Sequence, residues 1–152
     1  MKTLAKHRGR RLGALFGAIL VAAIVCAAPE NALAANTANS SYSFTFSGTG
    51  ATQGTAARSK QTSSVCYLRV SYLGLNRMNF YIDGATHPQG SWVNRTRGGV
   101  ATAYYTGHFS IHNYVNENGE SYARLTAMSP SGSGTVTGMW SPDSNESNTS
   151  LN

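Results

Sequence analysis

Histidines and carboxylates are the side chains of this chain best suited to metal binding or proton transfer. His108 and His112 are four residues apart, and on a helix this spacing would let both imidazoles ligate one metal ion. The alternation of apolar and polar residues around them predicts a strand, in which four residues span about 13 Å. One zinc ion with bonds of about 2 Å cannot bridge that distance, so we expect no metal here.

The carboxylates show no pattern typical of a glycosidase. Glu117 and Glu120 flank Asn118-Gly119, which predicts a turn, whereas a glycosidase needs two carboxylates facing each other across a cleft. We interpret both glutamates as solvated turn residues. Serine is abundant, but no Gly-x-Ser-x-Gly elbow is present. The sequence therefore predicts a protein that is not an enzyme, with no catalytic residues and no cofactor.

Cys66 is the only cysteine after residue 34, so the domain has no internal disulfide. It alternates with Leu68 and Val70 on one face of a predicted strand, and unpaired cysteine is among the most buried residue types. We expect a buried, unreactive thiol. An intermolecular disulfide and a nucleophilic thiol are the alternatives, and the second needs a neighbouring cation or base that no local motif supplies.

Trp92, Arg95 and Arg97 form the most compact group with binding character, in a segment that we expect to be a loop. Trp and Arg are typical of interaction hot spots, and loops on a rigid sheet are common binding sites. Tyr104 and Tyr105 follow in the next predicted strand, and aromatic rings can stack on sugar faces. We predict that these five residues bind a ligand; the alternative is a Trp that caps the core beside solvated arginines.

The elements that must position these residues follow a predicted signal peptide, residues 1–34. Five positive charges precede an uncharged apolar run, 12–28, and Ala32-Leu33-Ala34 supplies the small residues of a cleavage site. The run is short for a bilayer core of about 30 Å, so we expect cleavage and secretion rather than stable membrane insertion. Lipid attachment at Cys26 and twin-arginine export are weaker alternatives.

The charge that remains after cleavage is small. Five of the 12 Lys and Arg residues and one of the six acids precede residue 35, which leaves a net charge of about +2. Binding to nucleic acid through phosphates requires many positive charges at once. We therefore expect no nucleic-acid partner.

Composition and periodicity predict an all-β fold. Ser, Thr, Gly and Asn make up 56 of the 118 residues after residue 34, and β-branched and aromatic residues gather in short runs between them. We expect a single antiparallel β-sandwich, or a barrel-like domain, of about seven short strands. Its predicted parts are a flexible lead-in, 35–41, the sandwich itself, 42–141, and a disordered polar tail, 142–152.

Asn118-Gly119 is the clearest local turn pattern. A two-residue type I′ turn needs positive φ at both positions, which Asn-Gly tolerates best. We predict a hairpin that joins 109–117 with 120–128. Either of two sets of side chains could face the core. We favour the first over the second: Phe109, Ile111, Val115, Tyr122 and Met128, against His108, His112, Tyr114, Ala123, Leu125 and Ala127.

The C-terminal part resembles a loose group of small exported proteins of Gram-positive bacteria. The likeness rests on Ser121–Ala127 and on Gly134–Ser144, which ends in Trp140-Ser141-Pro142-Asp143-Ser144. It implies an exported β-rich domain of uncharacterised function, with no catalytic residues to carry over.

These observations favour a secreted, non-enzymatic β-sandwich that binds cell-wall glycan or a surface protein. The alternative is a secreted toxin or bacteriocin-like effector. A hydrolase assembled from His108, Asp83 and a serine is a third and weaker hypothesis. The sequence leaves the oligomeric state and the identity of the ligand open.

Overall fold

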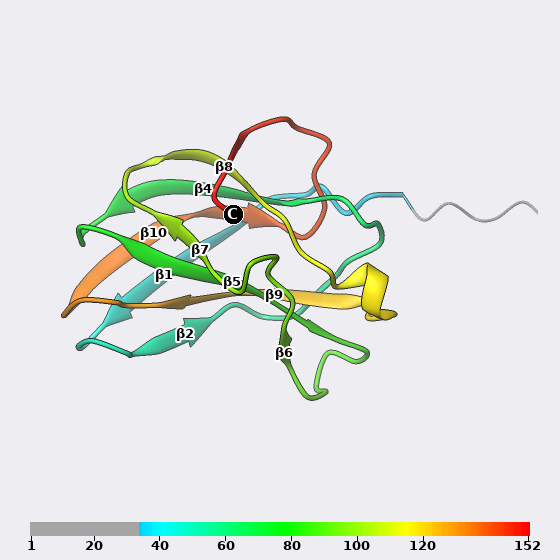
Figure 1. Cartoon of the computed structure of the whole chain (residues 1–152), viewed down its shortest axis with the longest axis horizontal. Helices are drawn as coiled ribbons and strands as arrows, with labels where there is room; N and C mark the ends of the chain where they lie inside the picture. Colours follow the sequence, from blue (N-terminus) through cyan, green and yellow to red (C-terminus); the bar gives the residue numbers. More distant parts are fainter. Residues whose placement is uncertain (1–33) are drawn as a thin grey trace, which may run out of the picture. The chain divides into compact units, whose positions relative to one another are not determined.

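The computed structural model describes residues 34–152 as two β-sheets packed face to face (Figure 1). The predicted signal peptide, apart from its last residue, lies outside this part. One short 3-10 helix, η1, spans Asn116–Asn118, and no helix within 34–152 is long and apolar enough to cross a membrane. The strands are β1 (Ser40–Phe46), β2 (Thr52–Gly54), β3 (Arg58–Ser59), β4 (Cys66–Leu73), β5 (Met78–Ala85), β6 (Val93–Asn94), β7 (Ala101–Ala103), β8 (Gly107–Ile111), β9 (Tyr122–Met128), β10 (Gly134–Ser141) and β11 (Thr149–Ser150).

The strand order confirms the predicted all-β sandwich. The first sheet has the order β1-β10-β4-β8-β11, and all its pairs are antiparallel except β8 with β11. In the second sheet the order is β2-β9-β5-β6, with β3 also pairing with β9 and β7 with β5. Because β9 and β5 sit at the centre of the second sheet, their outward side chains form its exposed face.

The core lies between the sheets and is built by period-two alternation. In β1, Tyr42, Phe44 and Phe46 are buried while Ser43 and Thr45 face solvent. The same rule buries alternate residues of the other long strands. They are Leu68 and Val70 of β4, Phe80 and Ile82 of β5, Phe109 and Ile111 of β8, Ala123, Leu125 and Ala127 of β9, and Val136 and Trp140 of β10.

The predicted hairpin at Asn118-Gly119 is wrong. Strand β8 belongs to the first sheet and β9 to the second, so the chain crosses between sheets here instead of turning back on itself. Gly119 does adopt positive φ, at 72°, but as the C-cap of η1. Each sheet contributes its own inward residues, so the buried set mixes the two predicted faces: Phe109, Ile111 and Val115 from one, and Ala123, Leu125 and Ala127 from the other.

Both ends of the described chain are part of the fold, which corrects the predicted flexible lead-in and disordered tail. The backbone N–H of Asn36 donates a hydrogen bond to Asp143, and β1 already begins at Ser40. Asp143 is completely buried, and Thr149 and Ser150 pair with β8. Polar composition predicts disorder, but these residues are held by hydrogen bonds and by Leu151, which packs against the core.

Gly138 is required where β10 bends against β4. The register of these two strands shifts between Thr137 and Gly138, and the hydroxyl of Tyr42 donates a hydrogen bond to the carbonyl of Arg69 nearby. A Cβ at position 138 would overlap the Arg69 carbonyl oxygen, whereas one at Gly48 would meet nothing within 4 Å.

We therefore expect Gly138→Ala to lower the free energy of unfolding by about 2 kcal/mol or more, because backbone must shift to make room. Gly48→Ala is the matched control and should leave stability within about 0.5 kcal/mol. Urea unfolding of the two variants measures the difference. Equal midpoints would show that the close approach at Gly138 is not a constraint.

Candidate functional site

The five predicted binding residues do not form one surface. Val93 of β6 pairs with Gly84, near the C-terminal end of β5, and Trp92 precedes it. Tyr104 and Tyr105 follow β7, whose last residue, Ala103, pairs with Met78 at the other end of β5. The length of β5 separates the two groups by about 20 Å. The two groups are close in sequence but lie apart in space, because β6 and β7 pair with opposite ends of β5.

Arg95 and Arg97 each have a partner within the protein. Nε and Nη2 of Arg95 donate to the carboxylate of Glu120, with Nη2 2.7 Å from Oε1. Glu120 is only 7% exposed, so its prediction as a solvated turn residue was wrong, whereas Glu117 is exposed. The guanidinium of Arg97 lies 5.1 Å from the ring centre of Tyr114. Arg95 therefore closes one end of the sandwich and is not free to bind a ligand.

Trp92 lies against a different arginine, one that the sequence analysis did not identify. The guanidinium of Arg124 is 4.7 Å from the Trp92 ring centre, a cation–π contact. Arg124 Nε in turn donates to Asp83 Oδ2 at 3.1 Å, and Thr126 Oγ1 donates to the same oxygen at 2.7 Å. Asp83 lies opposite Arg124 in the β5–β9 register, so this chain of contacts depends on pairing between strands 41 residues apart.

This chain of contacts lies on the outward face of the second sheet, where Asp83 and Thr126 are buried and Trp92 is half-buried. Phe80, Ile82 and Leu125 point into the core, so the residues that alternate with them point outward. Tyr81 and Tyr122, both partly exposed, occur at such positions on β5 and β9. We define the Trp92 face as this set: Tyr81, Asp83, Trp92, Tyr122, Arg124 and Thr126. It combines aromatic rings with fixed hydrogen-bonding groups, the combination that sugar binding requires.

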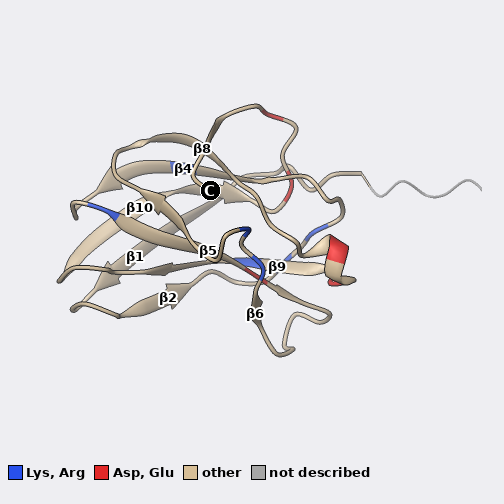
Figure 2. Ribbon diagram, viewed as in Figure 1, with Lys and Arg blue, Asp and Glu red and all other residues tan. Residues whose placement is uncertain are grey.

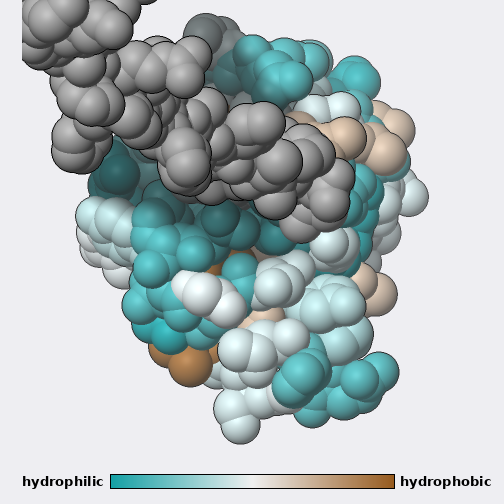
Figure 3. All heavy atoms as spheres, turned by 90° about the vertical axis from the view of Figure 1, so that its right-hand side faces the viewer, coloured by the Kyte–Doolittle hydropathy of each residue, from teal (hydrophilic) through white to brown (hydrophobic). Residues whose placement is uncertain are grey.

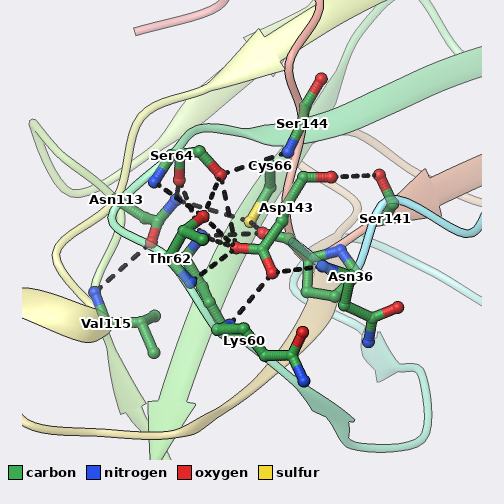
Figure 4. Close-up of polar contacts among 12 residues, drawn as sticks. Asn36, Lys60, Thr62, Ser64, Cys66, Asn113, Val115, Ser141, Asp143 and Ser144 are labelled. Carbon is green, nitrogen blue, oxygen red and sulfur yellow. Dashed lines mark hydrogen bonds and ion pairs between the residues drawn. The ribbon is translucent and has the colours of Figure 1, made fainter. Parts of the chain in front are cut away.

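A second polar cluster is buried where the segment Trp140–Ser144 meets the segment after β3 (Figure 4). Lys60 Nζ lies 3.0 Å from Asp143 Oδ1, and both side chains are completely buried. The ammonium also donates to the carbonyls of Ser64 at 2.7 Å and Pro142 at 2.8 Å. All three of its donors are therefore used.

Asp143 is equally well satisfied. Its Oδ1 accepts from Lys60, from the amide and hydroxyl of Thr62 and from the hydroxyl of Ser64, while Oδ2 accepts from the amides of Asn36 and Gln61. Burial by itself would raise the pKa of this carboxyl, but the amides and the Lys60 ammonium outweigh it and hold the pKa below its usual range. The cluster is a structural clamp, with no group left over for a substrate.

Cys66 is buried beside this clamp, as predicted. Its thiol donates to the carbonyl of Pro142 at 3.1 Å, and the Asn113 amide donates to its sulfur at 3.4 Å. Burial raises the thiol pKa to about 12. The thiol therefore stays protonated and a poor nucleophile at neutral pH.

The histidines and Asp83 do not assemble into a hydrolase site. His108 is on β8 of the first sheet, where its Nδ1 is 2.8 Å from the Tyr67 hydroxyl. Asp83 is on the exposed face of the second sheet, paired with Arg124. The core separates the two residues. Within residues 34–152, no group of three or more His, Cys, Asp or Glu side chains is placed to hold a metal ion.

Two polar cavities flank the segment Ser144–Asn148, which we call the strap. One, of about 170 Å³, is lined by Tyr67, by Ser141 and Asp143 at and just after the end of β10, and by residues of the lead-in and the strap. The other, of about 420 Å³, lies between the strap and the first sheet beside His112. At the end of the molecule that carries η1, the surface not covered by grey atoms is mostly hydrophilic or neutral (Figure 3). Within residues 34–152 the seven Lys and Arg residues lie at several separate places along the ribbon (Figure 2).

Comparison with known proteins finds a family match. The family profile described as "Protein of unknown function (DUF2712)" matches residues 30–144, which include the Lys60–Asp143 clamp and the Trp92 face. No curated protein and no solved structure gives a significant match.

The depressed pKa of Asp143 predicts acid-sensitive stability. The pKa of the Asp143 carboxyl is lower in the folded protein than in the unfolded chain. Its contribution to stability is therefore complete at any pH above the unfolded pKa, and it is lost as the pH falls through the folded pKa. Asp143→Asn should reduce the free energy of unfolding by about 3–5 kcal/mol at pH 7, since it leaves the Lys60 ammonium buried without a counter-charge. The deficit relative to the unmodified protein should shrink below about pH 4.

Urea unfolding between pH 7 and pH 3 tests this expectation. Glu117→Gln, which removes an exposed acid, is the matched control and should track the unmodified protein at every pH. A deficit of Asp143→Asn that stays constant over the whole range would show that the carboxylate form of Asp143 does not stabilise the fold.

Proposed function

The chain belongs to the DUF2712 family of proteins of unknown function, and we propose that it is an exported, non-enzymatic protein that binds polysaccharide of the cell envelope through the Trp92 face. The observation that carries the proposal is the chain of contacts Trp92–Arg124–Asp83–Thr126 on an exposed sheet face.

The Trp92 face is preorganised for a sugar ligand. Thr126 fixes the Asp83 carboxylate, Asp83 fixes Arg124, and Arg124 lies against the indole, so the ring has little freedom left to lose on binding. Tyr81 and Tyr122 extend the aromatic surface along β5 and β9. An open sheet face of this kind suits an extended polymer better than a small molecule that needs enclosure.

The carboxylates support binding rather than hydrolysis. Asp83, Glu120 and Asp143 are each held in an ion pair with an arginine or lysine. A general acid must reach the substrate's leaving group across a cleft, and these three carboxylates are held by their cationic partners instead. A ligand on the Trp92 face would therefore be held without being cleaved.

The proposal of export rests on the leader, with its basic start, apolar run and Ala32-Leu33-Ala34. We expect protein recovered from culture medium or from the cell-wall fraction to begin at Ala35, because a signal peptidase would cut after the second small residue. N-terminal sequencing of the recovered protein measures this. Recovery of a chain that still starts at Met1, from the cell interior alone, would refute export.

Sedimentation with isolated cell walls tests the binding proposal. We expect saturable binding that soluble wall polysaccharide competes away. Trp92→Ala should weaken it at least tenfold, or by about 1.4 kcal/mol, because truncated aromatic anchors dominate binding energies. Tyr104→Ala is the matched control: this aromatic side chain is more than half exposed but lies at the other end of β5, and its loss should leave binding unchanged.

The outcomes separate the hypotheses. Loss of binding with Tyr104→Ala but not with Trp92→Ala would move the site to the other end of the sandwich. No binding to any wall fraction would contradict the proposal and favour a diffusible effector such as a toxin, for which killing of neighbouring strains is the corresponding assay.

A further inference from the structure

The strap stands away from the rest of the fold between two firm anchors. At one end Asp143 is locked by six hydrogen bonds, and at the other Thr149 and Ser150 pair with β8. Ser144, at the start of the strap, is buried and donates its N–H to Ser64 Oγ at 3.2 Å. After Ser144 the side-chain hydrogen bonds of the strap are local: Glu146 N–H donates to Ser144 Oγ, and Asn148 Nδ2 donates to Glu146 Oε2. The rest of the strap, 145–148, can therefore shift without breaking either anchor.

The two cavities on either side of the strap share a wall. Ser144, Asn145 and Glu146 line both of them. The larger cavity, of about 420 Å³, falls within the usual range for small-molecule sites, while the smaller one, of about 170 Å³, suits a substituent. A small shift of the shared wall would change the size of both cavities together.

The lining is suited to hydroxyl groups. In the larger cavity it consists of serine hydroxyls, two asparagine amides, the His112 imidazole and the Glu146 carboxylate, and Val65 is the one aliphatic residue. The smaller cavity adds the phenol of Tyr67, the side chains of Thr37, Asn39 and Ser141, and the Asp143 carboxylate of the clamp. These groups both donate and accept hydrogen bonds, as a polyol requires. An apolar ligand would leave most of them unpaired.

The charge of the lining favours neutral or cationic ligands. Neither cavity is lined by Lys or Arg, and the Lys60 ammonium is fully used by its three acceptors. The pKa of Tyr67 is raised by burial of the phenol and by the negative charge of Glu146, while the Arg69 cation acts in the opposite direction. Two carboxylates, of Asp143 and of the exposed Glu146, line the smaller cavity and would repel an anion.

We propose that the strap and the two cavities form a binding site for a single sugar unit that is neutral or carries an amine, with Glu146 pairing with the amine. The larger cavity holds the sugar ring beside His112, and the smaller cavity holds a substituent against Tyr67. This site lies beside the first sheet, apart from the Trp92 face on the second, and it does not depend on binding of polysaccharide there.

Titration of the purified protein with three probe sugars, followed by NMR of backbone amides, tests the proposal. Glucosamine and N-acetylglucosamine should shift the amides of the strap and of His112 saturably, and glucuronate should bind at least tenfold more weakly. Glu146→Gln should weaken glucosamine at least tenfold while changing N-acetylglucosamine less than threefold, because only the first carries an amine. Asn145→Ala, an exposed residue that lines both cavities, should weaken both sugars.

Two variants separate this site from the Trp92 face. Glu117→Gln, which removes an exposed acid on η1, and Trp92→Ala should both leave the affinity for the two amino sugars unchanged. The proposal is overturned if the shifts fall outside the strap, if glucuronate binds as well as glucosamine, or if Glu146→Gln and Asn145→Ala have no effect. If neither amino sugar binds at the strap while the protein still binds cell walls, this inference fails and the proposed function stands.

Discussion

The buried ion pair between Lys60 and Asp143 is the interaction on which the rest of the fold depends. Two charges without access to water are tolerated only when their attraction is supplemented by hydrogen bonds to every remaining donor and lone pair, and the clamp provides these. It joins the segment after β3, at the edge of the second sheet, to the end of β10 in the first. With no disulfide between residues 35 and 152, this clamp holds the two sheets together at that end.

Period-two alternation was enough to predict the sandwich, because it is a local property of each strand. The burial of Phe44 and Cys66 could be read directly from their neighbours. The failure at Asn118-Gly119 shows the limit of this reasoning. The pattern correctly indicated positive φ at Gly119, but a left-handed residue serves a 3-10 helix cap as well as a hairpin, and only the pairing of the flanking strands distinguishes the two.

The functional surfaces were less predictable because their residues meet through register. Trp92 could be identified as an exposed aromatic, but its partner Arg124 follows 32 residues later and reaches it only because β9 lies beside β5. The burial of Lys60 could not be predicted from the sequence for a similar reason. It lies in a run without large apolar residues, which predicts exposure, and its burial is decided by Asp143, 83 residues away. Tail residues that looked disordered therefore carry the clamp.

The three ion pairs within residues 34–152 form a series of increasing exposure. Lys60–Asp143 is completely buried, Arg95–Glu120 is 26% and 8% exposed, and Arg124–Asp83 is 32% and 12% exposed. Replacing a partner in the first would leave a desolvated charge unpaired, which is strongly unfavourable. In Arg124–Asp83, water can solvate both charges if the pair is broken, and the guanidinium also contacts the Trp92 ring. Of these three pairs, Arg124–Asp83 is the most exposed, so replacing one of its partners should cost the least stability.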